Sequence, residues 1–488
     1  MTRVDVAVIG TGPNGLAAAV TMARAGLRVE LHEAAETIGG GLRTQPLLDR
    51  DIAHDICSAV HPMALASPFF EQFDLSRRGV AFATPRISYA HPLDDGRAGL
   101  AYRDLETTCT RLGGDGSRWR DLMAPLIEHS SGVAQLMLSG GQVLPRSPSA
   151  AFVLAPRILS HCTRLATRRY AGAEAKALFS GLAAHANGRL PSVVSAAVAL
   201  LLGHLAHTTG WPIPRGGSTR IAAALVADIE AHGGTVHTAN RIDDLRELAD
   251  ARVILCDLSP KEFVRIAKHE LPARYVRRLG RFRYGPAAAK VDFLVNEPIP
   301  WTNPEVAHAG TVHLGGTQAE TFRQETHTAA GIGTGAPFVL VSDPAVADLD
   351  RAHSGKRPVW AYAHVPNGDG VDPVPMVCRQ IERYAPGFSE TIIAARGICG
   401  AEYEAYNPNY VGGDIGAGAV TLRQALLRPT LRWGMHSTPL PHVYLCSAST
   451  PPGPGVHGMC GYLAAKLALR RRFGLSVPAL APGLSEAR

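Results

Sequence analysis

The stretch that decides the fold runs from Val4 to Thr44 and reads VDVAVIGTGPNGLAAAVTMARAGLRVELHEAAETIGGGLRT. Its first residues form an apolar, β-branched run, which predicts a buried parallel strand. The turn Gly10–Gly15 follows, and small and apolar residues typical of a helix then continue to Gly26. A second strand, LRVELHE, ends on Glu33. Strand, G-x-G-x-x-G, helix, strand and acid follow in the order that a dinucleotide-binding fold requires.

Each glycine of the turn has a separate role in this interpretation. Gly10 permits the tight turn, Gly12 lets the backbone approach a pyrophosphate, and Gly15 lets helix and strand pack closely. Pro13 and Asn14 begin the helix, whose first N–H groups and positive dipole end attract phosphate. We therefore expect these five residues to hold the diphosphate of a dinucleotide.

The residues after the second strand distinguish between dinucleotides. Glu33 can accept hydrogen bonds from a ribose and disfavours a 2′-phosphate, which favours FAD or NAD over NADP. Gly40, Gly41, Leu42 and Arg43 follow it. Here the chain resembles the FAD-dependent flavoproteins with two dinucleotide-binding domains, which include amine oxidases and phytoene desaturases. In that family a Gly-Gly-x-x-Arg stretch wraps the remainder of the flavin dinucleotide, so the resemblance implies FAD.

The C-terminal part carries the second motif of the same resemblance. The strand 443–446 ends at Ser447, and the turn 452–458 (PGPGVHG) leads into a helix. In the family, this turn meets the flavin ring and stabilises negative charge on it. The resemblance implies that Ser447, Gly455, Val456 and His457 contact the cofactor, and we also consider a catalytic role for His457.

The resemblance covers essentially the whole chain and implies an α/β fold. A Rossmann-type FAD-binding domain with an inserted α+β substrate domain is expected. In the family, the strand with Val236 lies against the adenosine portion, and the following strand ends at Asp257. The expected boundaries are 1–72, 212–268 and 396–470 for the FAD-binding domain, 73–211 and 269–395 for the substrate domain, and 471–488 for a loose tail. Residues 75–190 are expected to be mostly helical.

Lys290, near the start of the strand in PAAAKVDFLVNEPIPW, is a candidate catalytic residue. In flavin amine oxidases, a lysine at the matching place holds a water at the flavin N5. The alternative is a strand-end lysine that reaches solvent. An amine oxidase would also need an aromatic pair beside the flavin, for which Tyr403, Tyr406, Tyr410 and Trp433 are candidates.

Segment 337–366 is similar to the phytoene-desaturase-like branch that contains pyridine nucleotide-disulfide oxidoreductase domain-containing protein 2. The eight cysteines include no C-x-x-C pair, so a redox dithiol is not expected. Neither cysteine nor histidine spacing predicts a metal site. The glycines of 331–335 lack a preceding strand, so NAD(P) is not expected as a second cofactor.

Bulk properties restrict the partners. The chain of 488 residues is 46% hydrophobic and carries a net charge of +7, and no basic run is interleaved with aromatic residues, so nucleic acid is not expected. The first strand begins by residue 4, which predicts no targeting peptide and a cytoplasmic location. The uncharged stretch 190–214 is too short in its apolar part to span a bilayer and predicts a buried or interfacial helix. Residues 157–169 carry four arginines and favour either a solvated helix or a peripheral contact with anionic lipid.

These observations favour an FAD-dependent oxidoreductase of desaturase or dehydrogenase type. It would move hydride from a lipophilic, isoprenoid-like small molecule to flavin N5. The alternatives are an amine or amino-acid oxidase that uses oxygen, and an FAD-binding scaffold or redox-neutral isomerase. Substrate, electron acceptor and oligomeric state stay open.

Overall fold

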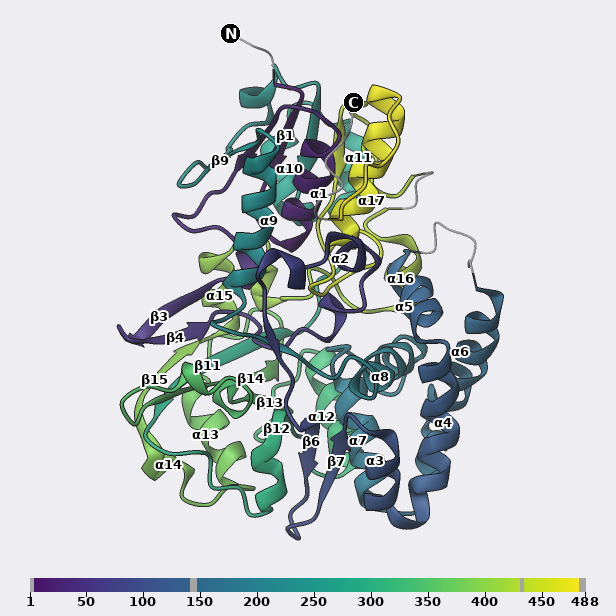
Figure 1. The fold of residues 1–488 in the computed structure, drawn as a ribbon, viewed down its shortest axis with the longest axis vertical. Helices are drawn as coiled ribbons and strands as arrows, with labels where there is room; N and C mark the ends of the chain where they lie inside the picture. Colours follow the sequence, from purple (N-terminus) through teal and green to yellow (C-terminus); the bar gives the residue numbers. More distant parts are fainter. Residues whose placement is uncertain (1–3, 141–146, 431–433, 482–488) are drawn as a thin grey trace.

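Two β-sheets organise the chain, whose computed structural model describes residues 4–140, 147–430 and 434–481. A five-stranded sheet lies in the upper half of Figure 1 and a seven-stranded sheet in the lower half. The chain passes between the halves several times, because segments from its beginning, middle and end all contribute strands to the upper sheet.

The five-stranded sheet is parallel and has the order β16-β10-β1-β2-β9. Its strands are β1 (Val6–Ile9), β2 (Val29–His32), β9 (Thr235–His237), β10 (Val253–Cys256) and β16 (Val443–Leu445). Counted along the chain this is 5-4-1-2-3, the doubly wound order in which ligands bind where the strand order reverses. The expected Rossmann-type fold class is confirmed.

Helices cover both faces of this sheet, because alternate residues of β1 point to opposite sides. Val6 and Val8 pack in the core under α1, α9 and α17, whereas Ala7 and Ile9 pack in the core under α10 and α11. The bounds are α1 (Pro13–Ala23), α9 (Thr219–Ala231), α10 (Pro260–Ala267), α11 (Ala273–Leu279) and α17 (Met459–Ala468). Gly461 allows α17 to cross α1 closely, since a Cβ there would lie 1.8 Å from the Asn14 carbonyl oxygen.

The seven-stranded sheet is mixed and has the order β15-β11-β14-β13-β12-β6-β7. Its strands are β6 (Ile87–Pro92), β7 (Ala98–Tyr102), β11 (Ala287–Val295), β12 (Ala309–Leu314), β13 (Val339–Ser342), β14 (Arg357–Val365) and β15 (Ile392–Ile398). One face is aliphatic and forms its own core. The other face carries aromatic and histidine side chains, among them Trp360, Tyr362 and His364. Two small sheets complete the strands: β3 (Thr44–Asp49) with β4 (Ile52–Asp55), and β5 (Phe82–Ala83) with β8 (Ile213–Pro214).

Helices pack beside the second sheet. They are α3 (Leu105–Arg111), α4 (Gly116–Glu128), α5 (Ser130–Leu138), α6 (Pro148–His161), α7 (Ala173–Ala184), α8 (Val193–Ala206), α12 (Gln318–Ala329), α13 (Val374–Glu382), α14 (Phe388–Thr391), α15 (Gly400–Tyr406) and α16 (Leu422–Leu427). One further helix, α2 (Pro68–Phe73), packs instead in the core of the first sheet. The mainly helical expectation for 75–190 is wrong between 82 and 102, where β5, β6 and β7 lie. Every residue of β6 is buried, so this strand lacks the polar alternation that would reveal it.

Two further expectations differ from the structure. Residues 157–169 do not form one helix, because α6 ends at His161 and a short 3₁₀ segment, Arg164–Arg168, follows. The described part of the expected loose tail packs back on the first sheet: Leu480 is 1% exposed, and Arg78 donates to its carbonyl oxygen. The domain boundaries and the lipid contact stay predictions.

Candidate functional site

The N-terminus of α1 is prepared for an anion. The N-cap, Gly12, makes no side-chain cap, and the first turn contains no acid. Asn14 is buried, and its Oδ1 atom has no hydrogen-bond partner. A Cβ at Gly40 would lie 3.0 Å from the Gly12 Cα, so the two glycine-rich turns touch. A helix N-terminus that has neither a side-chain cap nor an acid, and that is reached over glycines, is the feature that a dinucleotide phosphate needs, so these residues fit the predicted cofactor.

Asp257, at the end of β10, lies against the same turn. Its Oδ2 atom accepts a hydrogen bond from Gly15 N at 2.9 Å. Burial raises the pKa of this carboxyl to about 7, and the charge of Glu33 adds to the effect. The carboxyl is therefore partly protonated near neutral pH, which lowers its repulsion of a phosphate.

Glu33 is held firmly by its neighbours. Its Oε2 atom accepts hydrogen bonds from the Thr11 backbone and hydroxyl, and its Oε1 atom accepts from Arg43 Nη2 at 3.0 Å and from Ala35 N. The side chain is almost buried but lines the cavity described below. A ribose hydroxyl would have to share these oxygens, so ribose binding by Glu33 stays a prediction.

The closing turn is organised by His457. The ring Nδ1 atom accepts from Met459 N at 3.0 Å, so Nε2 carries the proton and donates to the Gly453 carbonyl oxygen at 3.1 Å. Burial lowers the pKa of His457 to about 4, which keeps the ring neutral. Both nitrogens are engaged, so the geometry does not support the catalytic role considered for His457. It supports a positioning role at the start of α17.

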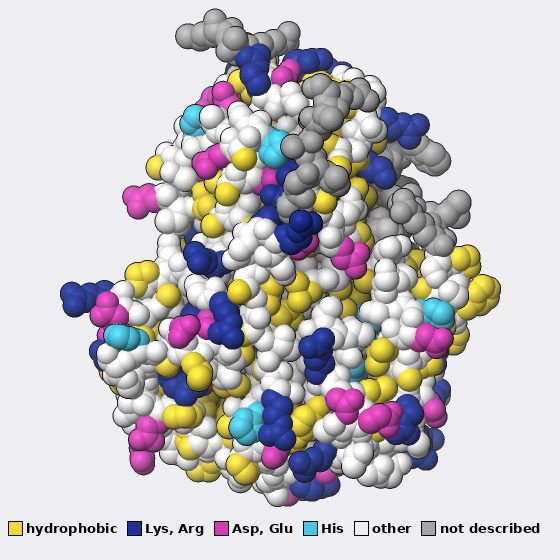
Figure 2. All heavy atoms as spheres, viewed as in Figure 1, with side chains coloured by type: hydrophobic (Ala, Val, Ile, Leu, Met, Phe, Trp, Pro, Cys, Tyr) yellow, Lys and Arg dark blue, Asp and Glu magenta, His cyan; other side chains and the backbone are white. Residues whose placement is uncertain are grey.

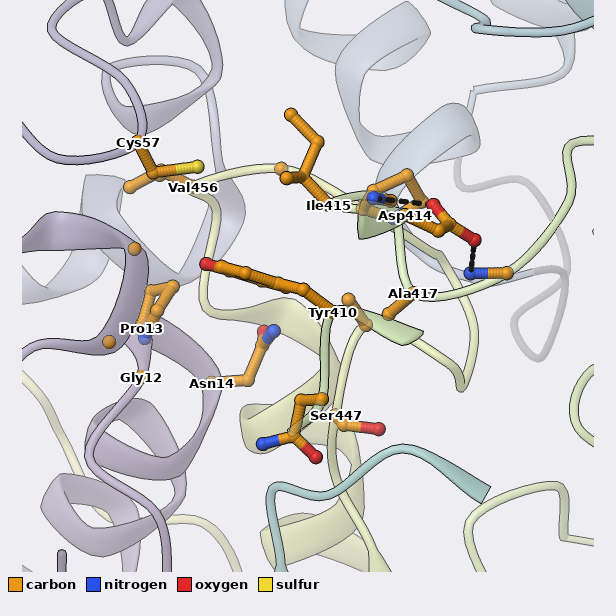
Figure 3. A pocket seen from close by; sticks show the side chains of 18 of the residues that line it. Gly12, Pro13, Asn14, Cys57, Tyr410, Asp414, Ile415, Ala417, Ser447 and Val456 are labelled. Carbon is orange, nitrogen blue, oxygen red and sulfur yellow. Dashed lines mark hydrogen bonds between the residues drawn. The ribbon is translucent and has the colours of Figure 1, made fainter. Parts of the chain in front are cut away.

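A cavity of about 940 Å³ joins the two motifs. Figure 3 shows Gly12, Pro13 and Asn14 on one side and Asp414, Ile415 and Ala417 on the other, with Tyr410 between them. The predicted cofactor residues that line it are Gly10, Gly12, Pro13, Asn14, Glu33, Gly40, Gly41, Arg43, Ser447, Gly455, Val456 and His457. Both ends of the chain therefore converge on one cavity.

Three predicted cofactor residues do not line this cavity. Gly15 faces the first turn, where a Cβ would lie 2.1 Å from the Gly10 carbonyl oxygen. Leu42 is buried in the core under α1, and Val236 packs at the edge of the same core. Their roles are to support the neighbouring turns and strands.

The far end of the cavity is formed by the aromatic face of the second sheet. Its walls include Trp211, Leu340, Trp360, Tyr362 and His364, together with the apolar side of α8. Trp360 and Tyr362 stack with ring centroids 5.8 Å apart, and Tyr362 stacks on His364 at 5.5 Å. This end can hold an apolar molecule.

Lys290 lies on this face of β11 but does not line the cavity. Its ammonium group donates to Asp292 Oδ1 at 2.5 Å, and the side chain is 1% exposed. His54 Nδ1 lies 3.5 Å from the same oxygen. The lysine does not reach solvent, but it is bound in a buried ionic cluster, and its catalytic role stays a prediction.

The candidate aromatic pair is only partly formed. Tyr406 and Tyr410 line the cavity, whereas Tyr403 is buried behind them and donates to the Ile56 carbonyl oxygen. Tyr403 meets Tyr410 edge to face at 5.8 Å. Trp433 lies outside the described residues.

Comparisons with known proteins address the cofactor. Residues 5–63 match the FAD dependent oxidoreductase family. Over this segment the chain is similar to the FAD-dependent oxidoreductases. FAD is its cofactor, and the residues around α1 are those that would hold it.

More distant likenesses extend over the chain. It is 23% identical to pyridine nucleotide-disulfide oxidoreductase domain-containing protein 2 of Rattus norvegicus over 53% of this chain and 51% of that protein. It is 22% identical to the Mus musculus protein of the same name over 96% and 93%. Cyclohexylamine oxidase from Brevibacterium oxydans shares the fold with a TM-score of 0.56, at 14% identity over 97% of this chain and 98% of that one.

Three residues near the site were not among the expected site residues. Arg428 is buried at the cavity wall and donates to the carbonyl oxygens of Ala448 and Gly418. Asp257 and Gly461 belong to ordinary strand-end and helix patterns. Of the three, only Asp257 could have been found from the sequence, because an Asp at the end of a strand can lie beside a glycine-rich turn.

Two observations concern other kinds of site. Among the described residues, no helix has both the length and the apolar character to cross a bilayer. The stretch 190–214 instead contains α8, which is mostly buried, as expected. In the same part of the chain, no group of three His, Cys, Asp or Glu side chains is arranged to hold a metal ion.

Proposed function

We propose that this oxidoreductase takes a hydride from a lipophilic small molecule held at the aromatic end of the cavity. The observation that carries the proposal is the continuity of the cavity from the dinucleotide motif to an apolar wall. Bound FAD supplies the hydride-accepting ring. The chain itself supplies orientation and a dry pocket, which are the contributions that such chemistry requires.

Figure 2 supports access to such a pocket, because hydrophobic side chains gather near the middle of the face shown, between the two halves of the molecule. Val193, Leu422 and Leu426 line the cavity and are themselves exposed, so apolar surface continues from the outside inward. A lipophilic substrate is favoured by such a path, since its transfer from water is driven by apolar contact.

Oxidation of an amine by oxygen is the second candidate. It is motivated by the fold shared with cyclohexylamine oxidase, but Lys290 is bound to Asp292 and does not line the cavity. Rapid reoxidation of the reduced protein by air favours the oxidase. Slow reoxidation, with a quinone as the better acceptor, favours a dehydrogenase.

The experiment is anaerobic reduction of the bound flavin by a panel of lipids, terpenoids and amines, followed by absorbance. The variant Leu340→Trp fills the apolar end and should abolish reduction while FAD content stays unchanged. Leu349→Trp, at a side chain that is 76% exposed, is the matched control. Equal reduction in both variants would contradict the proposed position of the substrate.

A further inference from the structure

His364 differs from the other histidines of the cavity in its partner. In the described part of the chain, five histidines line the cavity, and four bond to uncharged groups: His32 to Asn240, His61 to Ser218, His185 to His313 and His457 to Gly453. His364 Nδ1 instead lies 2.8 Å from Glu325 Oε1.

The pair is buried and fixed in orientation. The side chains of His364 and Glu325 are 2% and 1% exposed. Phe338 and Tyr362 pack on the imidazole with ring centroids 5.2 Å and 5.5 Å away. An ionised carboxylate only accepts hydrogen bonds, so Nδ1 carries the proton and Nε2 presents a lone pair.

Glu325 also places a carboxylate directly against this ring. Its Oε2 atom is buried without a hydrogen-bond partner, so part of its negative charge is uncompensated. A proton taken by Nε2 would convert the pair into imidazolium and carboxylate, which attract each other strongly at low dielectric. The other cavity histidines lack such a carboxylate partner, and burial lowers the pKa of His185 to about 3 and of His61 to about 4.

We propose that His364, positioned by Glu325, is the proton acceptor for a substrate that has an apolar body and a hydroxyl or amino group on the carbon to be oxidised. This rests on the proposed function. A hydride with its electron pair leaves that carbon for the flavin, which is reduced. The O–H or N–H bond breaks, its electron pair forms the C=O or C=N bond, and Nε2 takes the proton. Glu325 is a positioning residue, and His364 is the catalytic one.

The first measurement is binding of three probes, 1-octanol, octylamine and octyl methyl ether, followed by fluorescence of the cavity residues Trp211 and Trp360. The ether has no hydrogen to donate. The wild-type protein should bind the two donors roughly 2- to 12-fold more tightly than the ether, which is the worth of one hydrogen bond. Absence of that preference, or absence of binding by all three probes, overturns the proposal.

Variants assign the preference to the pair. His364→Phe keeps a ring between Phe338 and Tyr362 and should abolish the preference for the two donor probes over the ether. The double variant His364→Phe/Glu325→Leu should have the same effect without leaving a buried carboxylate unpaired. Glu325→Gln should reduce the preference while the affinity for the ether stays unchanged, a selectivity that a merely structural role would not alter. His327→Gln, on the exposed side of the same helix, is the control. An unchanged preference in the folded variants overturns the proposal.

The second measurement separates the two substrate sources. If the alcohol probe reduces the flavin, the substrate is an alcohol, and if the amine probe does, it is an amine. In either case His364→Phe should slow the reduction by about 10²–10⁴-fold. Tryptophan fluorescence reports probe binding beside His364 and Glu325 whether or not the flavin is reduced. A donor preference without reduction by any lipophilic compound would therefore refute the proposed function and leave the binding role of His364 standing.

Discussion

Replacement of Asp257 by Asn should change how FAD binding depends on pH. The carboxyl accepts from Gly15 N at 2.9 Å, and a Cβ at Gly12 would lie 2.7 Å from its Oδ2 atom. It is therefore a neighbour of the turn that holds the diphosphate. Burial, with the charge of Glu33, raises its pKa to about 7 in the free protein. A bound diphosphate adds negative charge, so the pKa should rise further and FAD binding should take up a proton.

The sign and size follow from linkage. For an acid whose pKa is raised by the ligand, affinity is highest where the acid is protonated and falls as pH rises through the pKa of the free protein. One pKa unit corresponds to 1.36 kcal/mol, so the limiting loss is about tenfold per pH unit, or up to about 100-fold between pH 7 and 9. The amide of the Asp257→Asn variant can accept from Gly15 N and donate to a phosphate, as the protonated carboxyl does, at every pH.

The assay is titration of the FAD-free protein with FAD at several values between pH 6 and 9, followed by quenching of flavin fluorescence. Asp257→Asn should bind FAD with little pH dependence and more tightly than the wild type at pH 9. Glu33→Gln is the matched carboxylate control; it should weaken binding at every pH and keep a pH dependence, shifted to lower pH because the charge of Glu33 helps to raise the pKa of Asp257. Equal slopes in the wild type and Asp257→Asn would refute the reasoning.

Three further outcomes are expected. Gly15→Ala, whose Cβ would lie 2.1 Å from a backbone oxygen, should abolish flavin absorbance in the purified protein, whereas Gly114→Ala, with no atom within 4 Å of an added Cβ, should retain it. Lys290→Met should lower the free energy of unfolding by about 3–5 kcal/mol, because Asp292 stays buried without its lysine partner. Lys290→Met/Asp292→Leu should recover most of that loss in denaturant titrations. Slower reoxidation in this folded double variant would support a catalytic lysine. Burial lowers the pKa of His457 to about 4, so the folded protein keeps this ring neutral. The free energy of unfolding should therefore fall by about 3 kcal/mol as the pH falls from 6.5 to 4, where the unfolded chain takes up a proton that the folded one does not. A thermal midpoint in His457→Gln with the same dependence on pH as the wild type would contradict this.

The dinucleotide end of the cavity could be predicted because its determinants are local. Gly10, Gly12 and Glu33 lie within one strand–helix–strand unit, and the conformation of a short turn follows from its glycines. The C-terminal motif was placed by resemblance, since a Gly/Pro turn alone does not say which strand it follows in space. The catalytic role considered for His457 is not supported for a related reason. Both of its ring nitrogens form hydrogen bonds within its own turn, which the residue type alone does not reveal.

The substrate end could not be predicted in the same way. His364 lies on β14 and Glu325 on α12, and their hydrogen bond depends on how α12 packs beside the sheet. Lys290 and Tyr362 are paired on neighbouring strands of that sheet, yet only Tyr362 lines the cavity. Lys290 instead bonds to Asp292, which also contacts His54, in a separate buried cluster. A sequence records which groups could transfer a proton. Which of them meets both a carboxylate and an open cavity is decided by tertiary packing, and in this fold that position belongs to His364.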